Sequence, residues 1–230
     1  MPKRDVGVII AAAGAGSRTD SAELKQFRWI SGKPMLLHSI QRFQQRADVA
    51  MVVCVLPHAY VGDPPPWIFQ SDTDRLLLSV GGKARAQSVS NGLEDIPPEC
   101  EIVVVHDAAR PFFTDAMADA VIAAARAGKC AVPVLPISDT VKRLDSEMSV
   151  TETVDRTDLW RVQTPQAFPR TMLERAHSSP LEERIGASDD ATLCERLGFP
   201  CVGVAGSEMA LKITTEADFT LAEALTILRE

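Results

Sequence analysis

Short apolar runs rich in valine and isoleucine recur along this chain, and the segments between them carry helix signals. An apolar run of about four to eight residues between turn residues is typical of a buried strand. Strands that alternate with helices predict an α/β fold, here Rossmann-like, with a mostly parallel sheet and helices on both faces. The expected strands are residues 6–12, 50–56, 76–80, 102–105, 131–135, 202–204 and 211–213.

Capping residues locate several of the expected helices. Thr114 is placed to cap an alanine-rich helix that ends near Gly128. Ser188 is expected to cap a helix through 191–197, and Thr215 with Asp218 forms a variant of the capping box. Further helices are expected at about 35–45, 84–93 and 170–177.

Residues 136–162 break this alternation. They mix charged and β-branched residues with little helical periodicity, and 140–144 can pair with 150–154 across a turn near Ser146. We therefore expect a β-hairpin arm that projects from the sheet. Because an isolated hairpin is marginally stable in water, we expect this arm to build a homodimer.

The first expected strand runs into Gly14 and Gly16, and Arg18 and Lys25 follow. Glycines let the backbone turn sharply and approach a ligand, and successive N–H groups in such a turn can bind one anion. Thr19 stands where a dinucleotide fingerprint has its third glycine, and the Gly-Lys-Ser/Thr of a P-loop is absent. The turn alone supports two interpretations equally: a phosphate-binding site, or an ordinary strand-to-helix turn whose cations are solvated.

Ligands of open α/β sheets bind at the carboxyl ends of the strands. That rule brings the Gly14 turn, a second glycine turn at Gly81 and Gly82, and Asp107 to one edge. Taken singly, a strand-end aspartate is usually a cap and an arginine a surface ion-pair partner. Together with basic residues further along, they suit an anionic nucleotide bound with Mg²⁺. The basic residues are Arg110, Lys142, Arg156 and Lys212.

Length and composition exclude several classes of protein. A chain of 230 residues with 46% hydrophobic residues is expected to form one domain, 1–230, with the arm at about 136–162. A net charge of −7 argues against nucleic-acid binding. The apolar runs fall short of the ~20 residues of a membrane span, and the N-terminus does not resemble a signal peptide. Five scattered cysteines without a Cys-x-x-Cys pair indicate a reducing, cytoplasmic setting.

Several motifs together resemble one enzyme family. The segment AAGAGSR with Lys25-Gln26 is similar to the signature of nucleotidyltransferases that make nucleotide sugars. More specific are HDAARP at 106–111, DTVKR at 139–143, TVDR at 153–156 and TPQ at 164–166. With these motifs the chain resembles the 2-C-methyl-D-erythritol 4-phosphate cytidylyltransferase family from Val6 to the C-terminus.

The resemblance implies a reaction in the non-mevalonate route to isoprenoids. The 4-phosphate of methylerythritol phosphate attacks the α-phosphorus of CTP and gives 4-diphosphocytidyl-2-C-methyl-D-erythritol and pyrophosphate, with Mg²⁺ or another divalent cation as cofactor. An ionised phosphate needs no general base, so catalysis would depend on positioning and charge stabilisation in an in-line displacement. The alternative is another sugar-phosphate or CMP-sugar nucleotidyltransferase.

The resemblance also implies residue roles. Arg18 and Lys25 would be catalytic and stabilise charge at the α-phosphorus. Asp107 would contact Mg²⁺, the nucleotide and the acceptor. The nucleotide would be bound by Ala13, Gly14, Ala15, Gly16, Lys25, Gly81, Gly82, Arg85 and Ser88. The acceptor would be bound by Ala108, Arg110, Thr140, Arg156, Thr164, Ser188 and Lys212, with the arm residues crossing from the partner subunit.

Three positions depart from the common family pattern. Leu24 precedes Lys25 where proline is frequent, and Ser188 stands where threonine is frequent. Lys83 replaces a frequent acidic residue. This change is harmless if the position contacts cytosine through its backbone, and it alters base specificity if a carboxylate is required.

Two interpretations from other classes compete with this one. A dinucleotide-dependent oxidoreductase is disfavoured by Thr19, and cofactor absorbance would reveal it. A non-catalytic nucleotide-binding protein is disfavoured by the combination of Arg18, Lys25 and Asp107. Binding alone does not require two cations around the α-phosphorus.

Overall fold

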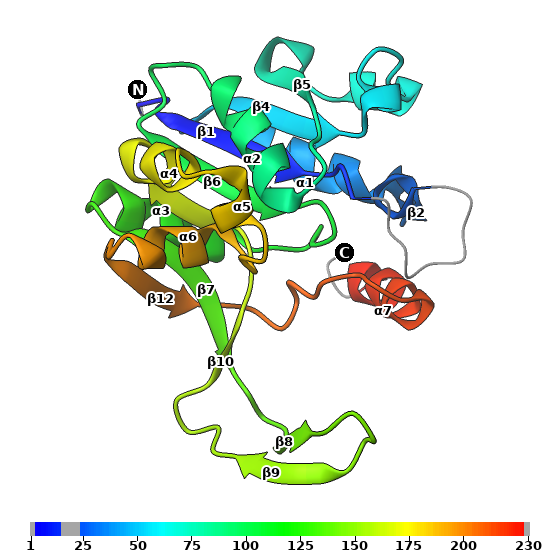
Figure 1. Ribbon diagram of the computed structural model, residues 1–230. Coiled ribbons are helices and arrows are strands. Elements are labelled where there is room, and N and C mark those ends of the chain that lie inside the picture. Colours follow the sequence, from blue (N-terminus) through cyan, green and yellow to red (C-terminus); the bar gives the residue numbers. More distant parts are fainter. Residues whose placement is uncertain (1–2, 15–23, 228–230) are drawn as a thin grey trace.

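The computed structural model describes residues 3–14 and 24–227, and a mixed eight-stranded sheet lies at its centre (Figure 1). The strands are β1 (Val6–Ala11), β4 (Val49–Leu56), β5 (Leu76–Val80), β6 (Ile102–Asp107), β7 (Cys130–Pro136), β10 (Trp160–Val162), β11 (Gln166–Pro169) and β12 (Cys201–Ala205). Their order is β10-β7-β11-β6-β1-β4-β5, and β12 pairs with β7. The strands β6, β1, β4 and β5 are parallel, as are β7 and β12, whereas β11 and β10 run antiparallel to their neighbours. The mostly parallel sheet expected from the sequence is confirmed.

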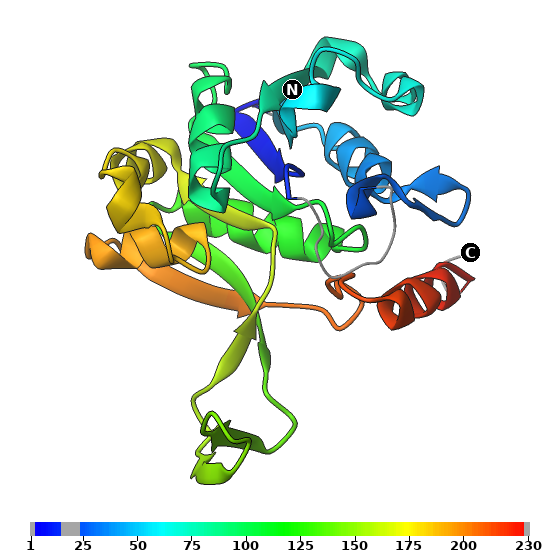
Figure 2. The same cartoon turned by 45° about the vertical axis from the view of Figure 1, so that its right-hand side comes forward.

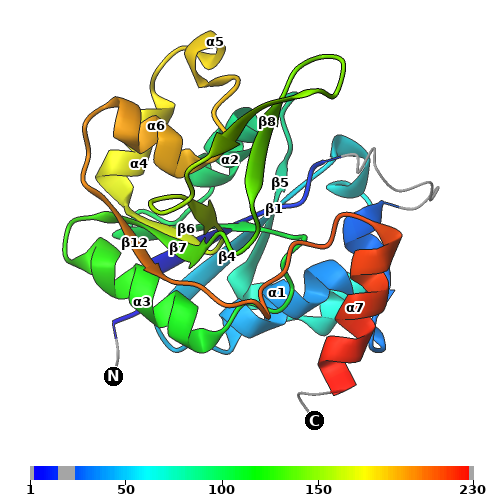
Figure 3. The same cartoon turned by 90° about the horizontal axis from the view of Figure 1, so that it is seen from below.

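Helices cover both faces of the sheet (Figure 3). One face carries α1 (Met35–Gln44) and α3 (Asp115–Arg126), and the other carries α2 (Arg85–Glu94), α4 (Arg170–His177) and α6 (Asp190–Arg196), with the short α5 (Leu181–Arg184) beside them. Successive side chains of a strand point to opposite faces. Accordingly, Val8 and Ile10 belong to the apolar cluster under α1 and α3, while Ile9 belongs to the cluster under α2, α4 and α6. Within the described ranges, every helix is too short or too polar to cross a membrane.

Capping explains where several helices begin and end. The Thr114 hydroxyl accepts a hydrogen bond from the Met117 N–H at 3.2 Å, and Gly128 with φ +81° follows the end of α3, as the sequence predicts. The prediction that Ser188 caps α6 is wrong. Asp189 is the cap, and its Oδ1 accepts from the Thr192 N–H at 2.9 Å. The helix begins one residue later than expected, so the neighbouring carboxylate takes the capping position.

The C-terminal helix α7 (Glu216–Ile227) packs away from the main sheet, beside a small hairpin of β2 (Trp29–Ile30) and β3 (Lys33–Pro34). Its expected capping box is present, because the Thr215 N–H donates to Asp218 Oδ2 at 2.8 Å. The strand expected at 211–213 is not formed. Its apolar residues instead join a third cluster, in which Ile213 and Phe219 pack with Ile30.

The segment between β7 and β10 leaves the body of the molecule as an arm (Figures 1 and 2). Its strands β8 (Val141–Leu144) and β9 (Val150–Val154) pair antiparallel, as the sequence predicts. Several large apolar side chains on and near the arm are exposed, among them Met148 at 76% and Val150 at 60%. The connection from β4 to β5 is irregular, with short 3-10 turns at His58–Tyr60, Pro66–Gln70 and Thr73–Arg75.

Candidate active site

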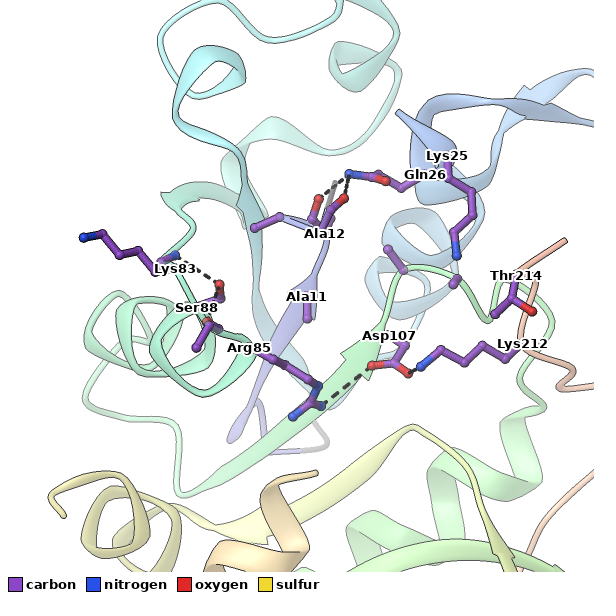
Figure 4. A pocket seen from close by; sticks show the side chains of 16 residues that line it. Ala11, Ala12, Lys25, Gln26, Lys83, Arg85, Ser88, Asp107, Lys212 and Thr214 are labelled. Atoms are coloured by element: carbon purple, nitrogen blue, oxygen red, sulfur yellow. Dashed lines mark hydrogen bonds and ion pairs between the residues drawn. The ribbon is translucent and has the colours of Figure 1, made fainter. Parts of the chain in front are cut away.

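A cavity of about 550 Å³ opens at the carboxyl ends of β1, β5 and β6, where the sheet rule places a ligand (Figure 4). Ala13 and Gly14 follow β1, Gly82 and Arg85 follow β5, and Asp107 ends β6. Three lysines also line it: Lys25 starts a 3-10 turn, Lys83 follows Gly82, and Lys212 precedes α7. Figure 4 shows the side chains of Lys25 and Lys212 directed into the same space.

The two glycine turns meet above the end of β4. The Ala12 N–H donates to the Val55 carbonyl at 2.9 Å, and the Gly81 N–H donates to the Leu56 carbonyl at 2.7 Å. A methyl group on Gly81 would lie 2.1 Å from the Cβ of Ala13. Glycine at position 81 therefore permits the two turns to touch.

The side-chain amide of Gln26 is hydrogen-bonded to the turn that follows β1. Its Nε2 donates to the Ala12 carbonyl at 2.5 Å and to the Gly14 carbonyl at 3.2 Å (Figure 4). Gln26 is 4% exposed, and the residue before it is Lys25. This clamp fixes the start of the glycine turn relative to the lysine.

Asp107 is the carboxylate of the cavity and lies between two cations. Its Oδ2 is 2.7 Å from Lys212 Nζ, and its Oδ1 is 3.7 Å from an Arg85 nitrogen (Figure 4). Burial opposes ionisation, but the charges of Arg85 and Lys212 outweigh it and lower the pKa of Asp107 to about 2. Asp107 is therefore a carboxylate at any pH near neutrality.

A buried hydrogen-bond chain fixes the loop that follows Asp107. His106 is fully buried, and its Nε2 donates to the Arg110 carbonyl at 3.1 Å. Because a carbonyl only accepts, this bond leaves His106 Nδ1 to accept from the Thr164 hydroxyl at 3.0 Å. The Thr164 oxygen in turn accepts from the Asp107 N–H at 3.1 Å. Burial lowers the pKa of His106 to about 3, so the ring is neutral and structural.

A second cavity of about 330 Å³ adjoins the first and shares Arg85, Asp107 and Lys212 with it. Its further walls include Arg110, Thr164, Gln166 and Ser188. The Arg110 NH1 donates to the Ala210 carbonyl at 2.8 Å, whereas its buried Nε has no hydrogen-bond partner among the described residues. Burial lowers the pKa of Arg110, which is the expected response of a cation that lacks a bonded carboxylate.

Comparison with known proteins identifies the family. The family model of 2-C-methyl-D-erythritol 4-phosphate cytidylyltransferase, IspD, matches residues 6–229. The chain belongs to the IspD family.

Members of the IspD family are similar to the chain over nearly its whole length. The 2-C-methyl-D-erythritol 4-phosphate cytidylyltransferase of Syntrophus aciditrophicus (strain SB) is 39% identical over 225 residues, which cover 96% of each chain. The enzyme of the same name from Salinibacter ruber (strain DSM 13855 / M31) is 38% identical and covers 96% of this chain and 92% of its own. The crystal structure of the Thermus thermophilus enzyme superposes with a TM-score of 0.81 at 34% identity, covering 99% of this chain and 100% of that one.

Most site residues predicted from the IspD resemblance meet at the two cavities. Among the described residues, the first cavity is lined by Ala13, Gly14, Lys25, Gly82, Arg85, Ser88, Asp107, Ala108 and Lys212, and the second by Arg85, Asp107, Arg110, Thr164, Ser188 and Lys212. Gly81 supports the first cavity through its packing on Ala13. Thr140 and Arg156 are exposed on the arm and line neither cavity. Ala15, Gly16 and Arg18 lie outside the described residues.

The structure also clarifies position 83. The Gly82 N–H donates to the Ser88 hydroxyl at 3.0 Å, and the Lys83 N–H donates to Gln87 Oε1 at 2.9 Å. In Figure 4 the Lys83 side chain extends away from Asp107 and Lys25. Both N–H groups are thus bonded within the loop and its helix, and the effect of Lys83 on base specificity stays a prediction.

The sequence did not predict the residues that hold site residues in place through hydrogen bonds. Gln26 is part of the Lys25-Gln26 motif, but nothing in the sequence shows that its amide bonds the glycine turn. His106 belongs to the HDAARP motif, but the motif alone does not show that its ring bonds Arg110 and Thr164. The sequence places Asp190 in the first turn of α6, where it is fully buried and bonds Arg85 at 2.6 Å. The residues of this pair lie 105 positions apart, beyond the reach of any local pattern.

Proposed function

We propose that this protein transfers a cytidylyl group from CTP to 2-C-methyl-D-erythritol 4-phosphate and releases pyrophosphate, as a step of non-mevalonate isoprenoid biosynthesis. The observation that carries the proposal is the shared wall of the two cavities, made of Arg85, Asp107 and Lys212. Two cavities with a charged common wall suit a reaction that joins a nucleotide to a second anion. Family membership supplies the identity of both substrates.

The first cavity suits the nucleotide. Its walls combine the backbone of two glycine turns with the cations Lys25 and Lys212, a combination that favours a polyphosphate. We assign the triphosphate to Ala13, Gly14, Ala15, Gly16, Arg18 and Lys25. The cytosine and its surroundings are assigned to Gly81, Gly82 and Ser88, with Arg85 as a supporting residue. In this arrangement Arg18 and Lys25 stabilise the charge that develops on the leaving pyrophosphate.

The second cavity suits the acceptor. Arg110 borders it with a buried Nε that lacks a partner among the described residues, and an acceptor phosphate would supply one. Thr164, Ser188 and Lys212 add hydroxyl and ammonium groups to the same walls. We assign methylerythritol phosphate to these residues together with Asp107 and Ala108.

Asp107 fits a divalent cation. Mg²⁺ in nucleotide sites is usually held by one or two carboxylates together with substrate phosphates, and Asp107 is an ionised carboxylate on the wall of the phosphate cavity. The nearest Arg85 nitrogen is 3.7 Å from Asp107 Oδ1, whereas Oδ2 bonds Lys212. When bound, the metal would neutralise phosphate charge, and Asp107 would hold it at the junction of the cavities.

The attacking group requires no base from the protein. The acceptor phosphate is already ionised near neutral pH, so the protein has to align it with the α-phosphorus and stabilise the charge. His106 is excluded as a base by its burial, its two ring-nitrogen hydrogen bonds and its pKa of about 3. The residues around the junction therefore act by position and charge.

We further propose a homodimer through the arm at about 136–162, built on one nucleotidyltransferase domain that spans 1–230 and works in the cytoplasm. Exposed apolar side chains on and near the arm, including Leu144, Met148 and Val150, support an interface, because a two-stranded sheet alone is marginally stable. Thr140 and Arg156 would then enter the acceptor cavity of the partner subunit. Light scattering at assay concentration tests this arrangement, and a fully active monomer would contradict it.

The function itself is tested by pyrophosphate release from CTP and Mg²⁺, with and without methylerythritol phosphate. ATP, GTP and UTP serve as control nucleotides, and other sugar phosphates serve as control acceptors. We expect release that requires both CTP and methylerythritol phosphate. Release with a different acceptor would identify another sugar-phosphate nucleotidyltransferase, and a folded protein without release would refute the proposed activity.

A further inference from the structure

Three helix ends meet at one buried carboxylate behind the active site. Arg85 is the first residue of α2, His177 is the last residue of α4, and Asp190 is the first residue of α6. The Asp190 side chain is 1% exposed. Its Oδ2 accepts from Arg85 NH1 at 2.6 Å, and its Oδ1 accepts from His177 Nε2 at 3.0 Å.

Asp190 is held in place by its neighbours in the chain and by His177. The His177 ring that bonds it is itself 3.0 Å from the Ser90 hydroxyl through Nδ1. The preceding residue, Asp189, caps α6 with one carboxylate oxygen and accepts from Gln166 Nε2 at 2.7 Å with the other. Asp190 therefore presents its carboxylate to Arg85 from a fixed point.

Arg85 lies between two carboxylates at unequal distances. One guanidinium nitrogen bonds Asp190 at 2.6 Å. The other is 3.7 Å from Asp107, outside hydrogen-bonding range, and Figure 4 shows this second pair. A charge-assisted bond of this length dominates the orientation of the side chain. Asp190 thus holds Arg85 beside Asp107 without letting it close on Asp107.

The charges at the junction explain why this matters. Arg85 and Lys212 are cations that both face Asp107. Asp190 adds the second negative charge from behind the wall. Burial opposes the ionisation of Asp190, but Arg85 and His177 outweigh it and lower its pKa.

We propose that Asp190, supported by His177, is a positioning residue of the reaction: it fixes the Arg85 guanidinium at the junction of the two cavities and leaves one Asp107 oxygen available to the reacting groups. The inference rests on the proposed cytidylyl transfer. Without the Asp190 charge, we expect Arg85 to turn to Asp107, 3.7 Å away, so that both Asp107 oxygens are bonded to cations.

The test is the Asp190→Asn variant, which keeps the size of the side chain and removes its charge. We expect kcat to fall about tenfold, as for other residues that orient a ligand from behind, while the KM for CTP changes little. The double variant Asp190→Asn with Arg85→Gln should have the same kcat as Arg85→Gln alone, because both changes act through one guanidinium. An unchanged kcat, or losses that multiply in the double variant, would overturn the proposal.

Asp5→Asn is the matched control. Asp5 is also a buried aspartate bonded to one arginine, Arg126, at 2.7 Å, but it precedes β1 at the opposite edge of the sheet. It should lower the melting temperature without changing kcat. Should Asp190→Asn fail to fold, His177→Gln tests the same network, and an unchanged kcat in that variant would contradict the proposal. Wild-type protein without CTP-dependent release would instead refute the proposed function.

Discussion

The contact between the two glycine turns gives a sharp prediction for Gly81→Ala. The added methyl would lie 2.1 Å from the Cβ of Ala13 and 3.2 Å from the Leu56 carbonyl oxygen. Two carbon atoms in contact are about 3.5–4.0 Å apart, so the two turns must separate by roughly 1.4 Å. The Ala13 Cβ is attached directly to the backbone and cannot rotate away.

The strands below the turns restrict where this displacement can go. Both turns are bonded to consecutive carbonyls of β4, Ala12 to Val55 and Gly81 to Leu56. Movement of either turn therefore breaks a backbone hydrogen bond or shifts the cavity wall. Overpacking of this kind costs about 1–3 kcal/mol of stability. A displacement of about 1 Å at a positioning element can reduce the rate about 100-fold, which corresponds to roughly 2.7 kcal/mol of activation free energy.

We expect Gly81→Ala to remain folded and to lose about 100-fold in kcat/KM, measured by pyrophosphate release. The double variant Ala13→Gly with Gly81→Ala moves the methyl from one turn to the other and should recover much of the lost activity. Gly62→Ala is the control, because a methyl there meets no described atom within 4 Å. Full activity in Gly81→Ala, or a double variant no better than the single one, would refute the reasoning.

Three further predictions concern the site and its support. Lys25→Ala should lower kcat at least about 100-fold with an unchanged melting temperature, since its charge acts mainly in the transition state; near-normal turnover would contradict its role. Thr164→Val removes the hydroxyl between His106 Nδ1 and the Asp107 N–H, and it should lower the free energy of unfolding by denaturant by about 2–3 kcal/mol. Thr164→Ser keeps the hydroxyl and should be close to wild type. Equal stability of the two variants would exclude the hydrogen-bond chain. Burial lowers the pKa of His106 from 6.5 to about 3, so the unfolded state binds the proton more readily than the folded state. The free energy of unfolding should therefore fall as the pH drops below 6.5, by up to about 1.4 kcal/mol per pH unit. Urea unfolding of His106→Gln should depend less steeply on pH, and parallel curves for variant and wild type would refute this assignment.

The sequence predicted those parts of the fold that depend on local patterns. The expected strands formed except 211–213, and Thr114 and Thr215 cap their helices as expected. The edge rule then brought Gly14, Gly82 and Asp107 to one cavity. Each of these inferences needs only a short window of residues and the general geometry of an α/β sheet.

Other features depend on contacts between distant segments. The short strands β10 and β11 are formed by pairing with β7 and β6, and their own residues carry little strand signal. Leu211 and Ile213 are apolar because they pack in the cluster under α7, and apolar residues alone do not distinguish this packing from a strand. The bond between Arg85 and Asp190 likewise joins two helices that no sequence pattern relates.

The docking of α7 has a consequence for thermal inactivation. The third apolar cluster, which joins Phe219 and Ala222 of α7 to Ile30 and Met35, is separate from the two clusters that sandwich the sheet. A small satellite of this kind can open while the main core stays folded. Lys212 lies just before α7, between Ala210, which is buried in a main cluster, and Ile213, which belongs to the third cluster and whose N–H donates to the Ala109 carbonyl at 2.8 Å. Opening of the satellite releases the residue that follows Lys212 and loosens its contact with Asp107. We therefore expect heat to lower activity before it melts the sheet, and cooling to restore activity without global refolding.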